Sequence, residues 1–367
     1  MALKKFEMRN VIASAGQLAS LLPQIESADR VAVDTEADSL HCYREKLCLL
    51  QVSLPGRDYV VDPLAGVELA PLSATLGRKE IVLHGADFDL RLLRRGLNFT
   101  AQHLFDTVIA ARLLGIREFS LAALVKRYFG VELGKGSQKA NWARRPLPAR
   151  MLEYAINDTH YLLPLAECLE SQLKQRDRID WLRQSCQRAI EQAAVERVRD
   201  EDEVWRIRGS ASLRGRAAAV LRALWQWREK EAEAADRPPF HILQNHELLN
   251  AAVSFASEKL PDYRHFSSRR RQAFRAAAQS ALQSRESEWP VSRRHSGTRP
   301  SAEMIARTEE LRRRRDRAAT KLDLEPSFIA PRSTLGVIAA DQTRATTLLV
   351  PWQRELLEVW GNAVASP

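Results

Sequence analysis

The chain has 367 residues, 45% of them hydrophobic, and a formal net charge of +10. This length exceeds one typical domain and allows two or three buried cores. There is no apolar run long enough to span a membrane, no signal-peptide core at the N-terminus, and no C-x-x-C spacing among Cys42, Cys48, Cys168 and Cys186. We therefore expect a cytoplasmic protein with reduced thiols, no zinc and no membrane partner. Its basic charge favours a polyanionic partner, most often nucleic acid.

Strand-like and helix-like segments alternate through the first third of the chain. We predict strands over residues 31–35, 47–53, 58–62 and 80–84, and helices over residues 15–28, 64–76, 88–95, 104–114 and 120–129. A longer helix is predicted over residues 148–173, kinked at Pro164. Strands followed by helices in this way predict an α/β layer with ligands bound at the strand ends.

Two acids stand at the end of the first predicted strand. Asp34 and Glu36 are separated by one residue, so their side chains point to the same face of a strand. Two carboxylates that project together repel each other, and a divalent cation is the simplest compensation. An isolated pair of this kind is usually a strand that ends in exposed acids. The metal hypothesis therefore requires further acids downstream.

Further acids follow the fourth predicted strand and lie on the long helix. The strand-to-helix turn carries Asp87 and Asp89, and either acid could serve only as a cap or as a partner of the helix dipole. Tyr154 and Asp158 are four residues apart and share one helix face. A lone pair of this type is usually an ordinary surface feature, but here it completes a set of acids.

The complete set comprises Asp34, Glu36, Asp89, Asp158 and Tyr154. Four carboxylates suit two hard cations, Mg²⁺ or Mn²⁺, which together form the clamp used for phosphodiester cleavage. A nearby phenol can orient the attacking water or help to remove its proton. The spacing of these residues thus predicts metal-assisted phosphoryl chemistry.

These residues lie in strings that resemble the three motifs of the DEDD 3′→5′ exonucleases, in the subgroup with tyrosine in the third motif. The longer strings resemble the ribonuclease D family and the related nuclease of the eukaryotic exosome. They are Asp34-Thr-Glu-Ala-Asp-Ser-Leu-His-Cys-Tyr, Cys48-Leu-Leu-Gln-Val-Ser, His84-Gly-Ala-Asp-Phe-Asp, Phe105-Asp-Thr, Trp142-Ala-Arg-Arg-Pro-Leu and Tyr154-Ala-Ile-Asn-Asp-Thr-His-Tyr-Leu-Leu-Pro. The resemblance covers about residues 8–200. It implies a ribonuclease H-like mixed sheet with helices, an RNA substrate and the 3′→5′ direction.

The resemblance also implies a role for each acid. Asp34 would bridge both metal ions, Glu36 and Asp158 would hold the ion on the nucleophile side, and Asp89 would hold the other. The tyrosine of the third motif would position the attacking water. In the family, the second-motif acid follows His-Gly/Ala-x-x-x, a spacing that favours Asp89 over Asp87.

Basic and aromatic residues outside the acid set are candidates for RNA contact. The irregular segment 135–145 carries lysines, arginines and one tryptophan, which could meet phosphates and a base. A solvated connection with a buried tryptophan explains the same segment equally well. The arginine runs at 269–271 and 312–315 could also meet phosphates, although such runs are usually solvated faces. The candidates are Lys135, Lys139, Trp142, Arg145, Arg269, Arg270, Arg312 and Arg313.

The rest of the chain is predicted to be helical. Helices are expected over residues 179–198, 213–235, 242–253, 267–283, 303–322, 333–340 and 351–360, with a linker at 285–300. Trp227-Arg and Phe240-His-Ile-Leu resemble the HRDC module, and residues 315–332 resemble the second HRDC repeat of the ribonuclease D family. Leu335, Ile338 and Leu349 would serve the core of that repeat. We predict an exonuclease domain at 1–200, a first HRDC domain at 205–290 and a second, HRDC-like domain at 300–367.

These inferences together predict a metal-dependent 3′→5′ exoribonuclease that trims RNA 3′ ends, such as those of tRNA precursors. It would use two-metal-ion hydrolysis, release nucleoside 5′-monophosphates, act as a monomer and require no protein partner. The alternatives are a DNA exonuclease of the same superfamily and a non-catalytic RNA-binding module. The HRDC pair argues against the first, and the presence of all five site residues argues against the second. The helical modules are expected to make RNA binding strongly dependent on salt.

Overall fold

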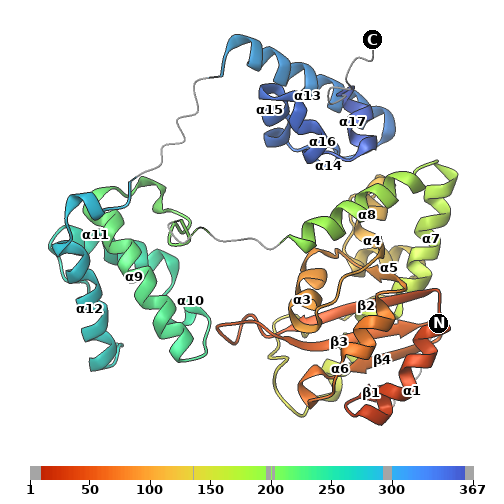
Figure 1. Cartoon of the computed structure of the whole chain (residues 1–367), viewed down its shortest axis with the longest axis horizontal. Coiled ribbons are helices and arrows are strands. Elements are labelled where there is room, and N and C mark those ends of the chain that lie inside the picture. Colours follow the sequence, from red (N-terminus) through yellow and green to blue (C-terminus); the bar gives the residue numbers. More distant parts are fainter. Residues whose placement is uncertain (1–9, 135, 196–199, 201–202, 292–299, 360–367) are drawn as a thin grey trace. The chain divides into compact units, whose positions relative to one another are not determined.

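The computed structural model describes residues 10–134, 136–195, 200, 203–291 and 300–359. The chain forms two compact units. The first comprises residues 1–37, 46–195 and 299–367, and it contains the sheet. The second comprises residues 38–45 and 196–298, and its regular structure is helical (Figure 1). The three domain boundaries expected from the sequence stay predictions.

A six-stranded mixed sheet lies at the centre of the first unit (Figure 1). In the order β1-β4-β3-β2-β5-β6, its strands are Val11–Ile12 (β1), Arg57–Val61 (β4), Leu47–Leu54 (β3), Arg30–Ala37 (β2), Glu80–Leu83 (β5) and His103–Asp106 (β6). Strands β2, β3 and β4 are antiparallel neighbours, whereas β5 and β6 continue the sheet in parallel from β2. The predicted α/β domain with a mixed sheet is confirmed.

The central strand β3 is buried along its whole length. Helix α6 (Ala149–His160) covers one face, where the Thr159 hydroxyl lies 2.7 Å from the Ser53 hydroxyl of β3. Helix α3 (Asp87–Leu97) meets β2 through a hydrogen bond between Thr35 and Asp89. Ser53 pairs with Ala32, so Thr35 projects to the opposite face from Ser53. The two helices therefore approach the end of β2 from opposite faces of the sheet.

Strand β6 replaces the start of a predicted helix. The prediction of one helix over residues 104–114 is wrong there, because His103–Asp106 pairs in parallel with β5 and helix α4 spans only Thr107–Leu113. Leu104 and Phe105 are buried by tertiary neighbours, which a local sequence pattern cannot predict. The short strand β1 was not predicted either, since two residues carry too little pattern.

The long helix predicted over residues 148–173 is two helices. Helix α6 ends at His160, and helix α7 spans Leu162–Gln175, with the break at Tyr161 rather than at Pro164. Proline has no N–H to donate to the carbonyl four residues earlier, and its ring clashes with that carbonyl. The interruption therefore falls one turn upstream, and Pro164 occupies the first turn of α7, where an N–H has no helical partner.

Before residue 196, the described part of the first unit contains four further helices. They are α1 (Ala15–Glu26), α2 (Ala70–Leu76), α5 (Leu121–Phe129) and α8 (Ile179–Ala194). The predicted helix over residues 64–76 is a short 3₁₀ turn, Pro63–Ala65, followed by α2. Residues 196–198 of the predicted helix 179–198 lie outside the described residues. Across the described ranges, no helix is long and apolar enough to cross a membrane.

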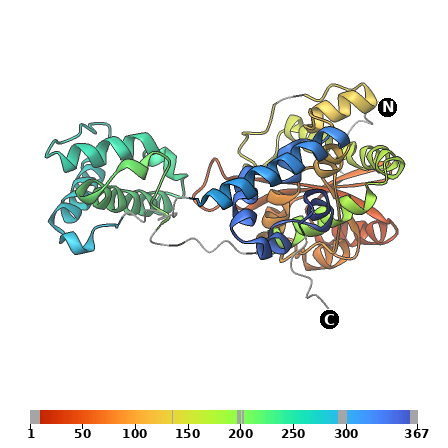
Figure 2. The ribbon, with the colours of Figure 1, turned by 90° about the horizontal axis from the view of Figure 1, so that it is seen from above.

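The C-terminal helices, drawn in blue in Figures 1 and 2, belong to the first unit. They are α13 (Ala302–Leu322), α14 (Pro326–Ile329), α15 (Arg332–Ala340), α16 (Ala345–Leu348) and α17 (Pro351–Leu357). The residues expected to form the core of these helices are at most 4% exposed: Leu335, Ile338 and Leu349. The indole of Trp352 stacks on Trp181 of α8 with ring centroids 5.0 Å apart, and its Nε1 donates to Ser185 at 3.0 Å.

The second unit is a bundle of helices, drawn in green to cyan in Figure 2: α9 (Gly215–Ala234), α10 (Pro239–Ile242), α11 (Asn245–Ala256) and α12 (Ser268–Gln283). Its aromatic core includes Trp227 and Phe274, whose rings meet edge to face at 4.9 Å. Trp227 is thus a core residue of this unit. The loop 38–45, which connects β2 to β3, is part of this unit, and Arg44 pairs with Glu233 of α9 at 2.7 Å.

We expect Trp352→Ala to lower the free energy of unfolding of the first unit by about 3–5 kcal/mol, because a fully buried indole is lost. Urea denaturation followed by circular dichroism measures this change. Ser185→Ala is the matched control, since it removes only the hydrogen bond to the indole and should cost about 1 kcal/mol. Equally small effects of both substitutions would contradict a packing role for the ring.

Candidate active site

Three of the predicted acids meet at the end of β2. Carboxylate oxygens of Asp34, Glu36 and Asp158 lie within 4.8 Å of one another. The strand places the first two on one face because they are two residues apart, and α6 packs on that face and supplies the third. The structure thus joins residues more than a hundred positions apart into one group of oxygen donors.

Asp89 approaches the same strand from the other face of the sheet. It is 7% exposed, and it accepts a hydrogen bond of 2.5 Å from the Thr35 hydroxyl of β2. Its charge raises the pKa of both Asp34 and Glu36, so it lies close enough to interact with them. Asp87, in contrast, is exposed and pairs with Arg91 one turn along α3 at 2.8 Å. This geometry supports Asp89 as the second-motif acid, which remains a proposal.

Burial raises the pKa of every acid in the group, and repulsion within the group raises it further at Asp34, Glu36 and Asp158. Burial is the largest cause in each case: the pKa of Asp34 lies well above its ordinary value, that of Glu36 is about 9, and that of Asp158 is about 7. The pKa of Asp89 is about 6, although its hydrogen bond from Thr35 acts in the opposite direction. The four carboxylates cannot all be charged near neutral pH without a compensating cation. A divalent ion with oxygen ligands fits this donor set.

Tyr154 lies one helical turn before Asp158 and donates a hydrogen bond to it. Its phenol accepts a hydrogen bond from the side chain of Gln138, and its ring lies 6.2 Å from that of Trp142. Burial and the nearby acids raise the pKa of the phenol, which is therefore neutral at physiological pH. A neutral phenol can donate to a carboxylate or accept from water. Gln138 had no motif to identify it in the sequence.

A second group missed by sequence reasoning shapes the turn before Asp89. Asp106, at the end of β6, accepts hydrogen bonds from the backbone N–H groups of Gly85 and Ala86 at 3.1 and 2.8 Å, and it also caps α4. The Thr107 hydroxyl donates to the Leu83 carbonyl at 3.1 Å. These bonds fix the β5–α3 turn and therefore the start of α3. The string Phe105-Asp-Thr was recognised by resemblance, but its physical role appears only in the fold.

Two candidates for RNA contact in the segment 135–145 have partners inside the fold. Trp142 is 1% exposed and packs beside Tyr154. Arg145 makes two hydrogen bonds to Asp62, at 2.6 and 2.7 Å, and three more to the carbonyls of Cys48, Trp142 and Arg144, and its side chain is 28% exposed. Contact of these two side chains with RNA stays a prediction, which the burial of Trp142 does not favour.

The remaining candidates are distributed over both units. Lys135 lies outside the described residues, whereas Lys139 and Arg269 are exposed and stay predictions. The side chain of Arg270 is 33% exposed and pairs with Glu231 at 3.0 Å. Arg312 and Arg313 pair with glutamates three positions earlier on α13, at 2.9 and 3.9 Å. Neighbouring acids therefore offset much of the charge of the arginine run, as expected for a solvated face.

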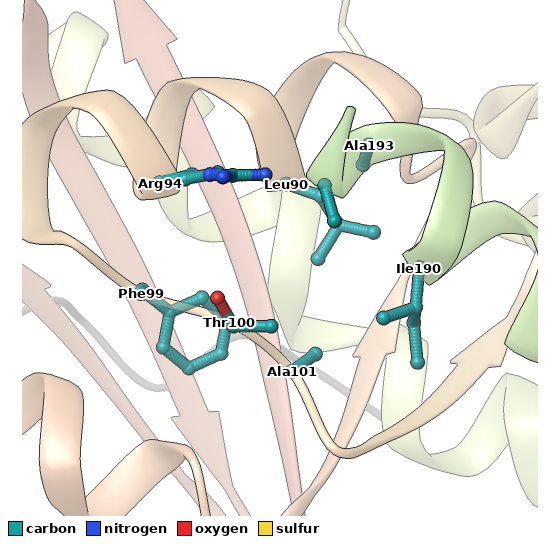
Figure 3. Close-up of a pocket in the computed structure, with 8 residues that line it drawn as sticks. Leu90, Arg94, Phe99, Thr100, Ala101, Ile190 and Ala193 are labelled. Atoms are coloured by element: carbon teal, nitrogen blue, oxygen red, sulfur yellow. The ribbon is translucent and has the colours of Figure 1, made fainter. Parts of the chain in front are cut away.

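A small cavity lies away from the acids, between α3, α8 and the chain before β6 (Figure 3). Its walls are largely apolar, with Leu90, Phe99 and Ile190 lining it and Arg94 on one side. Its volume of about 10 Å³ is close to the space of one water molecule. Since no acid lines it, this cavity is a packing gap and not the candidate site.

Comparisons with known proteins agree with this site. Residues 10–174 match the family described as 3'-5' exonuclease, and residues 217–256 match the HRDC domain. The sheet, α6 and all five predicted site residues fall within the first match. These matches define the class of the protein: a 3′→5′ exonuclease domain followed by an HRDC domain.

The ribonuclease D of Sphingobium indicum is 33% identical over 251 residues, which cover 67% of this chain and 64% of that protein. The crystal structure of Escherichia coli RNase D has a TM-score of 0.68 at 21% identity and covers 96% of this chain and 99% of its own. A protein of Bifidobacterium adolescentis has a TM-score of 0.79 at 23% identity and covers 95% and 94% of the two chains.

The structural matches show a common fold. The chain belongs to the ribonuclease D family, and it spans just under two thirds of the length of this curated relative.

The raised pKa values predict how the metal-free protein responds to pH. Each acid binds its proton more tightly in the folded chain than in the unfolded chain, whose carboxyl pKa is about 4. Stability should therefore fall as the pH rises from about 5 to about 9. Melting temperatures in EDTA across this range test the sign. Asp34→Asn should flatten the slope, and saturating Mg²⁺ should remove it; a wild-type melting temperature that is constant or rising would contradict the prediction.

Proposed function

We propose that this chain is a metal-dependent 3′→5′ exoribonuclease that trims the 3′ ends of RNA. The observation that carries the proposal is the meeting of three carboxylates within 4.8 Å at the end of β2, with a buried fourth acid beside them. Membership of the ribonuclease D family supports the reaction class, because its exonuclease domain contains all of these residues. The relatives' own names supply the RNA substrate, which is carried over here as part of the proposal.

The four acids are proposed to hold two divalent cations, Mg²⁺ or Mn²⁺. Asp34 would contribute to both positions, Glu36 and Asp158 to the one beside the attacking water, and Asp89 to the one beside the leaving oxygen. Bound cations would supply a water of lowered pKa and would stabilise the charge on the departing 3′ oxygen. Thr35 and the α3 turn keep Asp89 facing the group, because the Thr35 hydroxyl binds its carboxylate.

The phenol of Tyr154 is proposed to position the attacking water. Gln138 and Trp142 hold the ring in place, and the phenol stays neutral because burial raises its pKa. In the reaction, water adds to the terminal phosphorus, the bond from phosphorus to the 3′ oxygen of the preceding nucleotide breaks, and that oxygen takes up a proton. The products are a nucleoside 5′-monophosphate and an RNA that is one nucleotide shorter and ends in a 3′ hydroxyl.

The natural substrates are proposed to be structured RNA precursors such as those of tRNA. The relatives include proteins named ribonuclease D and a protein named exosome complex component 10 homolog. The exposed basic residues Lys139 and Arg269 are proposed to contact the RNA backbone. We further propose that the chain acts in the cytoplasm as a monomer and requires no protein partner.

Asp34→Asn is expected to lower the rate of RNA shortening by about 10³-fold or more, because it removes a charged ligand shared by both proposed cations. The assay follows a 5′-labelled, 3′-extended RNA with Mg²⁺, with Mn²⁺ and with EDTA. Wild-type protein should produce a ladder that shortens from the 3′ end, and EDTA should abolish it. RNA binding should survive in the variant, because no basic contact changes.

The same assay separates the proposal from its alternatives. Faster shortening of a DNA strand of matching sequence than of the RNA would favour a DNA exonuclease. Intact RNA binding without shortening in any metal would favour a non-catalytic binding module. Shortening that persists unchanged in EDTA would overturn the metal-dependent mechanism.

Asp89→Ala is expected to reduce the cleavage rate by about 10³-fold, whereas Asp87→Ala should leave it within about twofold of wild type. The reason is that Asp89 is buried beside the acid group, whereas Asp87 is exposed and paired with Arg91. Asp87→Ala is a matched control because both acids lie in the first turn of α3. The reverse order of effects would transfer the second-motif role to Asp87.

A further inference from the structure

Gln51 is a buried amide on the central strand. It lies on β3 directly opposite Asp34 of β2 in the antiparallel register, so the two side chains project to the same face of the sheet. Gln51 is 0% exposed, and within the described part of the chain neither its Nε2 nor its Oε1 has a hydrogen-bond partner. A buried amide with both polar atoms unpaired is destabilising and uncommon in folded proteins.

Other polar side chains between β3 and α6, near Gln51, are paired. The Ser53 hydroxyl donates to Asp58 at 2.6 Å and lies 2.7 Å from the Thr159 hydroxyl. The Nδ1 atom of His160 lies 2.7 Å from the other carboxylate oxygen of Asp58. These hydrogen bonds reach Ser53, two residues from Gln51 on β3, and do not include Gln51. Leu49 on the same strand and Val60 opposite on β4 share the face of Gln51, and both are apolar and fully buried, so a hydrophobic side chain would suit this position.

The geometry points to a partner for Gln51 inside the acid group. Directly opposite residues of an antiparallel pair have Cβ atoms roughly 4.5–5.5 Å apart, which places the Asp34 carboxylate within reach of the Gln51 amide. A carboxylate that binds a cation through one oxygen leaves the other oxygen, and the surrounding bound water, in need of hydrogen bonds. An amide offers both a donor and an acceptor.

We propose that Gln51 is a positioning residue of the metal site, whose amide N–H holds the Asp34 carboxylate in its cation-binding orientation while its carbonyl accepts from bound water. This inference rests on the proposed function, because it requires that the acid group binds a divalent cation. Gln51 does not contact the scissile bond. It acts through Asp34, and its side chain is unpaired when the acids are free of metal.

The test uses the full chain without RNA and Mn²⁺ as the probe. Isothermal titration with Mn²⁺ should show a Kd about 10- to 100-fold higher for Gln51→Leu than for wild type, as is typical when a residue that orients a metal ligand is lost. The melting temperature of Gln51→Leu in EDTA should equal or exceed that of wild type, because an unpaired buried amide has been removed. A purely structural glutamine would give the opposite pattern.

Ser53→Ala is the matched control on the same face of the same strand. It removes a hydroxyl that has two hydrogen-bond partners, Asp58 and Thr159. It should therefore lower the melting temperature in EDTA and leave the Kd for Mn²⁺ within about twofold of wild type. Gln51→Met provides a second variant with a flexible, unbranched side chain in case leucine packs poorly on the strand.

The outcomes separate this inference from the proposed function. Wild-type affinity for Mn²⁺ in both Gln51 variants, or loss of folding in both, would overturn the positioning role and leave the exonuclease proposal standing. A wild-type chain that does not bind Mn²⁺, or an Asp34→Asn chain that binds it as tightly, would overturn the proposed function itself. The expected result for the Gln51 variants is weakened Mn²⁺ binding with a melting temperature in EDTA equal to or above that of wild type.

Discussion

Four carboxylates near the end of β2, three of them half-buried and one buried, repel one another, and much of the surrounding structure serves to keep them together. Burial raises the pKa of each acid, most clearly at Glu36, where it reaches about 9. Such repulsion is relieved when the acids take up protons or when a cation binds to them. The same group of acids therefore lowers the stability of the chain without metal and gives it a site that can bind a cation.

The sheet and two helices hold these acids in place. Helix α6 supplies Asp158 from one face of the sheet, and helix α3 supplies Asp89 from the other. Helix α3 is anchored away from the acids, because the Asp106 carboxylate accepts hydrogen bonds from the backbone N–H groups of the turn before it. Since Asp106 lies at the end of β6, the acid group depends on sheet order as much as on its own residues.

Several basic residues form ion pairs with acids of the same chain. The bidentate pair of Arg145 with Asp62 closes the segment before α6 onto the sheet, and arginines of α13 pair with glutamates on the same helix. Much of the positive charge that the composition suggests for a polyanion is thus already paired inside the protein. Lys139 and Arg269 are exposed, and their contact with a phosphate backbone stays a proposal.

The sequence by itself determined the acid set, because motif spacing, strand alternation and helix periodicity depend only on nearby positions. It placed Asp34 and Glu36 on one face, put Tyr154 one turn from Asp158, and indicated the mixed α/β domain and the HRDC module. It did not reveal β6 or the break at Tyr161, and it left open whether Trp142 is buried. Those features depend on which strands and helices become neighbours, and a local pattern carries no information about such partners. Only the tertiary structure could show that Gln51 lies opposite Asp34, because register between β2 and β3 is a property of the paired sheet and not of either strand.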